Sequence, residues 1–459
     1  MMMNPLIFRQ YDIRGNAERD LTDETVRLLG RAFGSYVQEH GSREVLVGRD
    51  NRLSSPRLHQ AFVDGLVASG CLVMDLGLIV TPMLYYARIY FGIDGGVMIT
   101  GSHNPPDENG FKLACGDGTI YGEEIQYLRE IIEKKRFTSG AGKVVERDIA
   151  APYLAMLKEK IALGRRKLKV AVDCGNGTAS LFAERILEGW GCDVIPLHCV
   201  SDGRFPVHHP DPVKTANLQD LRKAVAEHGA DLGVAYDGDA DRIGVVDEKG
   251  EVIWGDKLMC LYWREILGSH PNALAIIEVK CSQALVEEVT RLGGRPLFYK
   301  TGHSLIKAKM KETGAVFTGE MSGHMFFADE YYGYDDALYA TGRLLRILSN
   351  TQQSLGELLK DIPKYYATAE TRVPCDDRVK FKVVAGLVEK FRKEYEVIDV
   401  DGARVLFPDG WGLVRASNTQ PVLVARCEAK TPEALQRISG VMKAAMVQYP
   451  EVGDFDWEY

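Results

Sequence analysis

A short stretch around Ser102 has the residue types and spacing needed for covalent chemistry. Residues 100–105 read TGSHNP and follow the apolar run 96–99, so a nucleophilic hydroxyl stands in a tight turn after a predicted strand. Serine beside glycine, asparagine and proline is also common in turns that do no chemistry. The hydrolase elbow G-x-S-x-G is absent, because Thr100 and Asn104 occupy its glycine positions. We therefore interpret Ser102 together with the other polar loops of the chain.

Three carboxylates stand at alternate positions in residues 237–242, DGDADR, between the apolar runs 232–236 and 243–246. Like charges this close repel one another unless a hard cation shares them, and oxygen ligands favour Mg²⁺ or Ca²⁺. An EF-hand calcium loop does not fit, because Arg242 stands where that loop needs glycine and strands flank it instead of helices. A solvated acidic turn is the other interpretation. Beside such a cation, a phosphorylated Ser102 would complete the coordination with its phosphate oxygens.

Two further loops offer groups for a sugar phosphate. Residues 319–324, GEMSGH, supply a carboxylate, a hydroxyl and an imidazole, and carboxylates pair well with neighbouring sugar hydroxyls. Residues 415–421, RASNTQP, combine a guanidinium, hydroxyls and an amide, which suits a phosphate group. Helix caps and a hairpin turn would use the same residue types. The chain has no Walker A pattern, so this loop is not a nucleotide P-loop.

Basic residues stand at the ends of the same predicted strands. Each one alone would be an ordinary surface charge, but together in an acidic chain they would make a focused phosphate site. They are Arg14 in the stretch 11–15, Arg49, Lys112, Arg242, Lys280 and His303.

One loop matches a dinucleotide fingerprint in part. Residues 175–180, GNGTAS, follow a predicted strand, and Asp193 stands near the place of a ribose-binding acid. Ser180 replaces the third glycine, which makes the match weak. A dinucleotide-dependent oxidoreductase is therefore kept as an alternative that requires binding of NADH.

The elements that must position these loops repeat one plan three times. First strands are predicted at 44–50, 169–173 and 274–280, each followed by a helix and a glycine-led second strand at 70–74, 191–195 and 294–298. Continuous apolar runs suit strands buried on both faces of a parallel sheet, and such sheets bind ligands at the carboxyl ends of their strands. We expect three similar domains that direct the loops 100–105, 237–242 and 319–324 to one shared cleft.

A chain of 459 residues is too long for one hydrophobic core, so we expect several domains. Four are predicted, with boundaries where the repeated strand–helix–strand pattern stops and restarts. The fold class predicted is α/β, with mixed or parallel sheets in the first three domains and a smaller α+β domain at the end. The predicted boundaries are 1–147 with the Ser102 loop, 148–250 with the carboxylate loop, 251–363 with the Glu320 loop and 364–459 with the Arg415 loop.

Composition narrows the class of protein further. A hydrophobic content of 46% and a charged content of 26% are typical of a globular protein, and a net charge of -8 argues against nucleic-acid binding. Nine cysteines without a C-x-x-C pair indicate buried thiols of a reducing compartment, not disulfides or a zinc site. No stretch reaches membrane-spanning length. We expect a cytoplasmic protein, a monomer or small homo-oligomer, with neither nucleic acid nor membrane as partner.

The four loops TGSHNP, DGDADR, GEMSGH and RASNTQP, in this order, resemble the signature loops of the α-D-phosphohexomutases, bacterial phosphomannomutase/phosphoglucomutases in particular. The resemblance spans essentially the whole chain. It implies three similar α/β domains and a fourth, mobile one around a central cleft. It also implies reversible conversion of a hexose 1-phosphate, of mannose or glucose, into the 6-phosphate through a phosphoserine. Mg²⁺ would be the cofactor, and hexose 1,6-bisphosphate the intermediate and activator.

The same resemblance implies roles for individual residues. Ser102 would carry the phosphoryl group and bind the metal together with Asp237, Asp239 and Asp241. The other catalytic residues would be Arg14, Lys112, Arg242 and His303. The phosphosugar would be bound by Tyr11, Lys280, Glu320, Ser322, His324, Arg415, Ser417, Asn418 and Thr419.

Two alternatives to this function remain besides the oxidoreductase. Met321 favours the mannose/glucose type over a phosphoglucosamine mutase, whose loop usually has glutamine at that position. A protein that binds phosphosugars without turnover is disfavoured by the complete set of nucleophile and metal ligands.

Overall fold

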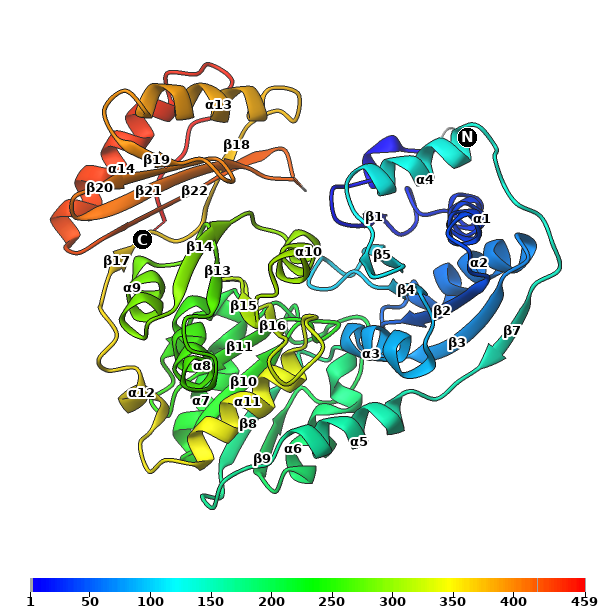
Figure 1. Ribbon diagram of the computed structural model, residues 1–459, viewed down its shortest axis with the longest axis horizontal. Coiled ribbons are helices and arrows are strands. Elements are labelled where there is room, and N and C mark those ends of the chain that lie inside the picture. Colours follow the sequence, from blue (N-terminus) through cyan, green and yellow to red (C-terminus); the bar gives the residue numbers. More distant parts are fainter. Residues whose placement is uncertain (1–2, 419, 459) are drawn as a thin grey trace. The chain divides into compact units, whose positions relative to one another are not determined.

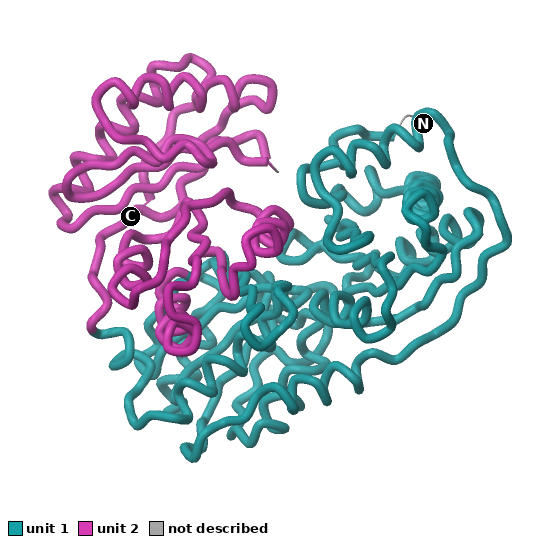
Figure 2. The backbone as a smooth tube through the Cα atoms, viewed as in Figure 1, with its two compact units in different colours: residues 1–255, 322–360 teal, residues 256–321, 361–459 magenta. Residues whose placement is uncertain are grey.

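The computed structural model describes residues 3–418 and 420–458, which contain four β-sheets with their helices (Figure 1). The chain divides into two compact units (Figure 2). The first comprises Met1–Gly255 and Ser322–Lys360, and the second comprises Asp256–Met321 and Asp361–Tyr459. Among the described residues, no helix has the length and apolar content needed to cross a membrane.

The first sheet, in the first unit, has seven strands in the order β1-β5-β4-β2-β3-β7, with β6 beside β5. Its centre is parallel, because β3 and β4 both pair with β2 in the same direction, while β5 runs antiparallel to β4. The strands are β1 Ile13–Asn16, β2 Glu44–Arg49, β3 Leu72–Leu78, β4 Gly95–Ile99, β5 Glu108–Cys115, β6 Gly118–Thr119 and β7 Lys143–Glu146, and the helices are α1 Asp23–Glu39, α2 Ser55–Ala68, α3 Thr81–Phe91 and α4 Glu123–Glu133.

The second sheet, also in the first unit, has the order β12-β11-β10-β8-β9. Asp193 pairs with Lys169 at the beginning of β8, whereas Gly175 follows its end. Asp193 thus lies at the amino ends of the parallel strands, whereas the glycine loop that begins at Gly175 lies at their carboxyl ends. A dinucleotide site would need both at the same ends. The elements are β8 Lys169–Asp173, β9 Asp193–Leu197, β10 Leu232–Tyr236, β11 Ile243–Val246, β12 Val252–Ile253, α5 Ala150–Lys160, α6 Ala183–Gly189 and α7 Gln219–His228.

In the second unit, parallel strands β14 and β15 flank β13. The three parallel cores share one order, β3-β2-β4, β9-β8-β10 and β14-β13-β15, which confirms the predicted repeat. The elements here are β13 Leu274–Glu278, β14 Arg295–Tyr299, β15 Phe317–Gly319, α8 Gly255–Ser269, α9 Gln283–Arg291 and α10 His303–Thr313; β16 Met325–Phe327, α11 Ala337–Ser349 and α12 Leu355–Leu358 follow in the chain.

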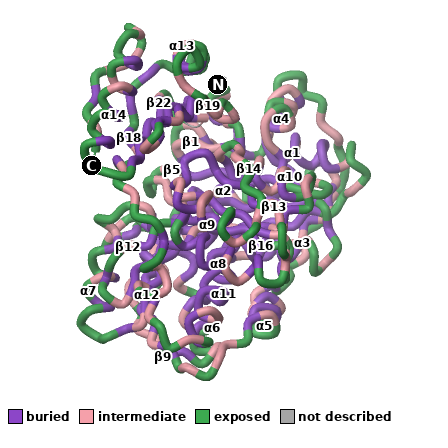
Figure 3. Tube along the Cα trace, turned by 60° about the vertical axis from the view of Figure 1, so that its left-hand side comes forward, coloured by how far each residue is buried: buried purple, intermediate pink, exposed green. Residues whose placement is uncertain are grey.

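The fourth sheet is antiparallel and contains β17 to β22, so the predicted α/β class with a smaller α+β domain is confirmed. Alternate residues of its strands pack against α13 and α14, while Trp411 and Leu413 face Val279 beyond β13. Figure 3 shows buried residues along the strands. The elements are β17 Tyr366–Ala367, β18 Thr371–Pro374, β19 Glu396–Ile398, β20 Ala403–Phe407, β21 Gly410–Ala416, β22 Val422–Ala429, α13 Lys380–Phe391 and α14 Pro432–Met446.

Candidate active site

Ser102 lies in a buried turn directly after β4. Its backbone adopts a positive φ of 49°, an uncommon conformation for a residue other than glycine. The turn is held by Thr100, whose Oγ1 accepts a hydrogen bond from the Ser102 amide at 2.8 Å. The Ser102 hydroxyl instead donates to Asp237 Oδ2 at 2.7 Å. The side chain of Thr100 therefore stabilises the turn, and the hydroxyl of Ser102 faces the carboxylate of Asp237.

A buried arginine that the sequence reasoning missed supports this turn. The guanidinium of Arg52 donates to the carbonyl oxygens of Ser102 and Asn104 at 2.8 and 2.7 Å, and to those of Pro105 and Glu108 at 2.6 and 3.0 Å. A Cβ atom at Gly101 would lie only 2.5 Å from this guanidinium, so the position requires glycine. The sequence signal was weak, because a single arginine after a strand resembles a surface charge.

The carboxylates of Asp237, Asp239 and Asp241 are fully buried, and their oxygens lie within 4.8 Å of one another. Asp239 Oδ2 accepts hydrogen bonds from Thr81 Oγ1 at 2.5 Å and from Lys112 Nζ at 2.7 Å, and Lys112 also bonds to Asp241. Burial, and then repulsion from the other two carboxylates, raises the pKa of Asp237 well above its ordinary value.

These carboxylates fit a hard cation. Asp239 Oδ1 and Asp241 Oδ1 are buried and have no hydrogen-bond partner among the described residues. Leaving a buried acceptor unsatisfied costs about 1–3 kcal/mol, and more for a charged group. The donor set consists of oxygens alone, which Mg²⁺ and Ca²⁺ prefer. The cluster can thus hold a divalent metal ion.

The pKa values of Lys112 and His103, both near Ser102, are shifted in opposite directions. Burial alone would lower the pKa of Lys112, but Asp239 and Asp241 outweigh burial and raise it well above its ordinary value. Burial, followed by the charge of Arg242, lowers the pKa of His103 well below its ordinary value. The His103 ring is therefore neutral at pH 7, with Nδ1 3.1 Å from the Ser102 hydroxyl.

Arg242, His324 and Asp335 form a chain of contacts in the first unit. Arg242 Nε donates to His324 Nε2 at 2.9 Å, so the ring proton of neutral His324 lies on Nδ1. That nitrogen is 2.9 Å from the buried carboxylate of Asp335, which the sequence reasoning also missed. Gly323 has a φ of 94° and its carbonyl accepts from the Ile243 amide at 3.1 Å, which ties this loop to β11.

The remaining predicted residues of the first unit lie near these groups to different degrees. Arg14 donates to Asp12 at 2.6 Å and to Asn104, in the Ser102 loop, at 3.4 Å. Tyr11 is buried, and Ser322 is half-buried in the loop before His324. The structure thus brings together Ser102, the three aspartates and Lys112, with Arg242 joined to His324 and Arg14 to the serine loop.

In the second unit, acidic side chains organise the predicted sugar and phosphate groups. Glu320 Oε1 accepts from the amide of Gly302 at 2.7 Å, immediately before the buried His303. Asp401 Oδ2 accepts from Arg415 Nε at 2.8 Å and from the amide of Thr301 at 3.1 Å, so it links the Arg415 loop to the residues before His303.

Lys280 is buried between two carboxylates of the second unit. Its ammonium is 2.9 Å from Glu370 and 3.8 Å from Glu278, and these charges outweigh burial and raise the pKa of Lys280. In turn, Lys280 lowers the pKa of Glu370 to about 2. Glu278, Glu370 and Asp401 were not predicted, because isolated acidic residues after strands carry no distinctive pattern.

The Arg415 loop connects β21 to the antiparallel β22. Ser417 is buried and its hydroxyl accepts from the Gln420 amide at 3.1 Å, while Asn418 is half-buried. The predicted phosphate ligand Thr419 lies outside the described residues.

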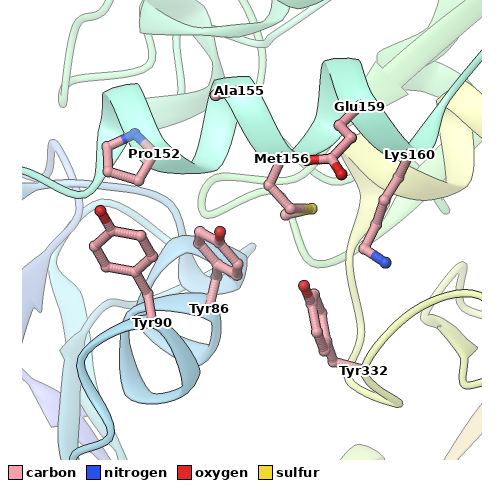
Figure 4. A pocket seen from close by; sticks show the side chains of 8 residues that line it. All are labelled: Tyr86, Tyr90, Pro152, Ala155, Met156, Glu159, Lys160 and Tyr332. Atoms are coloured by element: carbon pink, nitrogen blue, oxygen red, sulfur yellow. The ribbon is translucent and has the colours of Figure 1, made fainter.

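A separate cavity of about 340 Å³ in the first unit contains none of the predicted site residues (Figure 4). Tyr86 and Tyr90 of α3 lie opposite side chains of α5, and Tyr332 closes a third side. The Lys160 ammonium is 4.9 Å from the centre of the Tyr332 ring and donates to the Glu330 carbonyl at 2.8 Å. The full lining is Tyr86, Tyr90, Pro152, Ala155, Met156, Glu159, Lys160 and Tyr332.

The buried Asp336, also in the first unit, gives a testable pH dependence. Its carboxylate accepts from Tyr153 and Tyr331 hydroxyls at 2.7 and 2.6 Å, and burial nevertheless raises its pKa to about 6. The folded state thus binds this proton more tightly than the unfolded chain, and the resulting stability is present below about pH 4 and lost as the pH rises through 6. Relative to Asp336→Asn, the wild type should lose about 3 kcal/mol of unfolding free energy over that range.

The measurement is the urea midpoint of both proteins between pH 4 and pH 7. Asp148→Asn is the matched control, because Asp148 bonds to the first turn of α5 from the exposed surface. Its midpoint should follow the wild type. Parallel pH profiles for Asp336→Asn and wild type would contradict the prediction.

The fold and this site are those of a phosphoryl-transfer enzyme, since a buried serine hydroxyl faces a carboxylate cluster flanked by cationic side chains. Family models match the chain in order: phosphoglucomutase/phosphomannomutase alpha/beta/alpha domain I at residues 5–139, domain II at 151–250, domain III at 254–366, and the C-terminal domain at 370–444. The chain belongs to the phosphoglucomutase/phosphomannomutase family, whose enzymes are isomerases.

Individual relatives are similar to this chain over nearly its full length. The phosphomannomutase/phosphoglucomutase of Pseudomonas aeruginosa is 47% identical over 438 residues, covering 95% of this chain and 94% of that protein. The phosphoglucomutase of Neisseria meningitidis is 44% identical, covering 97% and 98%. A phosphoglucomutase/phosphomannomutase family protein of Burkholderia thailandensis, solved by X-ray crystallography, has a TM-score of 0.91 at 42% identity, covering 97% and 98% of the two chains.

Proposed function

We propose that this enzyme interconverts the 1-phosphate and the 6-phosphate of mannose, glucose or both, through a phosphoserine at Ser102. The observation that carries the proposal is the position of the Ser102 hydroxyl. Thr100 Oγ1 makes the hydrogen bond that holds the turn, and the Ser102 hydroxyl lies 2.7 Å from Asp237. The names of the relatives above support the reaction, and Met321 supports the mannose/glucose type.

Mg²⁺ is the proposed cofactor, held by Asp237, Asp239 and Asp241 with an oxygen of phosphorylated Ser102. The Oδ1 atoms of Asp239 and Asp241, which have no hydrogen-bond partner among the described residues, and the oxygen-only donor set support this assignment. When bound, the ion neutralises charge on the phosphoryl group. In the present structure Lys112 supplies the countercharge to Asp239 and Asp241.

The chain's own residues would carry the reaction in two transfers. The bond between phosphorus and Ser102 Oγ breaks while a free sugar hydroxyl forms a bond to phosphorus and gives its proton to a general base. The bisphosphorylated sugar then turns, and its other phosphate returns to Ser102. Because the transition state spreads negative charge over the phosphoryl oxygens, positioned cations supply much of the catalysis. We assign this role to Arg14, Lys112, Arg242 and His303.

The remaining predicted residues would hold the substrate. Carboxylate and hydroxyl groups suit the sugar, and the Arg415 loop suits the phosphate that is not transferred. We assign the sugar to Glu320 and Ser322, the phosphate to Arg415, Ser417, Asn418 and Thr419, and further contacts to Tyr11, Lys280 and His324. We also assign the four domains to 1–147, 148–250, 251–363 and 364–459.

The free thiols support a reducing environment for the working enzyme. All nine cysteines lie in the described part of the chain, and each is a free thiol. Thiols persist in this form where glutathione and thioredoxin keep them reduced. We therefore propose a cytoplasmic location.

A coupled assay tests the proposed function. Glucose 1-phosphate, mannose 1-phosphate and glucosamine 1-phosphate are supplied in turn, with Mg²⁺ and a trace of hexose 1,6-bisphosphate. Turnover of the first two is expected, and preference for the third would favour a phosphoglucosamine mutase. Absence of turnover with any of them would contradict the proposal, and NADH binding would favour the oxidoreductase.

Arg415→Lys should raise the KM for the hexose phosphate about 10-fold or more, with a smaller change in kcat, because lysine cannot make the two parallel hydrogen bonds of a guanidinium to phosphate. Steady-state kinetics with glucose 1-phosphate measure both constants. Arg437→Lys is a matched control, since Arg437 pairs with Asp409 on the exposed side of the same domain. A change confined to kcat would argue against phosphate binding by Arg415.

A further inference from the structure

A second group of potential metal ligands lies in the first unit, outside the residues assigned to phosphoryl transfer. Asp173 is the last residue of β8, His198 follows β9 directly, and His208 lies in the next loop. One ligand atom from each of these side chains lies within 4.8 Å of the others. Asp173 is buried and both imidazoles are half-buried, so the group is open to solvent on one side.

Asp173 and His208 form a hydrogen-bonded pair whose facing atoms could each bind a metal ion instead. Asp173 Oδ1 accepts from the Gly175 amide at 2.8 Å, which leaves Oδ2 facing His208 Nε2 at 3.0 Å. His208 Nδ1 is 2.8 Å from the carbonyl of His209, so Nδ1 carries a proton and donates it. Metal-binding histidines commonly donate one ring N–H to a carbonyl in this way while the other nitrogen binds the ion.

His198 has a comparable supporting contact. Its Nε2 is 3.1 Å from Asp220 Oδ2, and the two imidazole rings of His198 and His208 lie edge to face with centroids 5.3 Å apart. A carboxylate that accepts one ring N–H fixes the tautomer and makes the other nitrogen a better ligand. With Nε2 protonated toward Asp220, the lone pair of His198 is on Nδ1.

We propose that Asp173, His198 and His208 bind one divalent transition-metal ion, Zn²⁺ in particular. Two imidazoles and one carboxylate are a common set of protein ligands for zinc, with a fourth position left for water or another ligand. The cluster at Asp237 has a different donor chemistry, because it offers oxygens alone. The first unit thus contains one site for a hard cation and one for a borderline cation.

Metal binding here would tie together three chain segments next to the catalytic loops. Pro210, two residues after His208, lies against Gly175 and Gly238, where an added Cβ atom would come within 3.0 and 3.4 Å of it. Gly238 belongs to the loop that contains the three aspartates. An ion that binds only the folded state stabilises it in proportion to its occupancy. The proposed ion should therefore raise the resistance of the unit to unfolding.

Cobalt(II) provides the spectroscopic test on the full-length enzyme. With Mg²⁺ in excess to occupy the oxygen cluster, one equivalent of Co²⁺ should give the visible absorption of a nitrogen-ligated site of low coordination number, and Zn²⁺ should abolish it by displacement. His198→Ala and His208→Ala should each weaken Co²⁺ and Zn²⁺ binding about 10-fold or more. His209→Ala is the matched control, because this neighbouring histidine is exposed and should bind as wild type does.

The urea midpoint is a second readout of metal binding, independent of the cobalt spectrum, and it also shows whether each variant folds. Zn²⁺ should raise the urea midpoint of the wild type and of His209→Ala, but not of His198→Ala or His208→Ala. Midpoints measured with a chelator present establish whether each variant folds. His208→Ala also loses the hydrogen bond to Asp173 and could fail to fold for that reason. In that case the result for His198→Ala decides the proposal.

Three results would overturn the proposal. The first is unchanged metal binding in a folded His198→Ala. The second is loss of the cobalt spectrum in Asp239→Asn, which would place the ion in the oxygen cluster. The third is a sulfur-to-cobalt charge-transfer band that disappears in Cys199→Ser, since Cys199 Sγ lies 3.4 Å from Cys174 Sγ and thiolates also bind zinc.

Discussion

Ser102→Ala should lower mutase turnover by about 10⁴-fold or more, because removal of a nucleophile eliminates the covalent route and leaves only residual catalysis. The two hydroxyls nearest in role are engaged elsewhere, since Thr100 Oγ1 is occupied by the turn and Thr81 Oγ1 donates to Asp239. Intact-mass spectrometry should detect one phosphoryl group on the wild type after incubation with hexose 1,6-bisphosphate, and none on the variant.

The fold should survive this substitution, so the loss can be attributed to chemistry. The loop is held by the carbonyl of residue 102, which accepts from Arg52, and by its amide, which donates to Thr100. Both backbone groups remain in alanine. Ser180→Ala is a matched control in the short 3-10 helix Thr178–Leu181 after β8 and should keep full activity. Undiminished turnover in Ser102→Ala, or phosphorylation of the variant at another residue with retained activity, would rule out the proposed intermediate.

Asp239→Asn should reduce kcat by about 10³-fold and raise the Mg²⁺ concentration needed for half-maximal activity, because it removes a charged ligand from the cation. Asparagine has nearly the same shape, and its carbonyl oxygen can still accept from Thr81. The expected effect therefore arises from lost charge and lost metal affinity. Kinetics across a Mg²⁺ titration measure both quantities.

Asp247→Asn is the control for this prediction. Asp247 is also a buried carboxylate, directly after β11, but it accepts from the backbone amides of Lys249 and Glu251 in the following turn. Its substitution should leave the Mg²⁺ dependence unchanged. If Asp239→Asn kept the wild-type Mg²⁺ dependence, the carboxylate cluster would not be the metal site.

Much of the fold was predictable, because the central strands are buried on both faces. The continuous apolar runs at β4 and β10 were recognised for this reason, and every residue of these two strands is buried. The polar loops after them were recognised because carboxylates, hydroxyls and glycine follow directly after strand residues. Because the strand–helix–strand pattern repeats, the loops 100–105, 237–242 and 319–324 were expected at equivalent strand ends.

Contacts between distant segments were not predictable in the same way. Arg52 is indistinguishable in the sequence from a surface arginine, yet it binds four carbonyl groups of the serine loop. Asp335 has no motif that connects it to His324, and Asp401 has none that connects it to Arg415. Such partners are selected by strand register and packing, which a local pattern does not contain.

The sequence by itself determined the class of fold, the four polar loops and the proposal of Ser102 as nucleophile, since each depends on residues that are close together in the chain. Only the tertiary structure decided that Thr100 holds the turn while Ser102 faces Asp237, that Lys112 lies between Asp239 and Asp241, and that two histidines meet Asp173. Asp173 and His198 meet because the parallel strands β8 and β9 bring their carboxyl ends to one edge of a sheet. Ser102 and Lys112 of the first sheet instead meet the aspartates of the second through the packing of the two sheets. Residues far apart in the chain become neighbours in both ways, and their charges, hydrogen bonds and metal-binding capacity follow from that proximity.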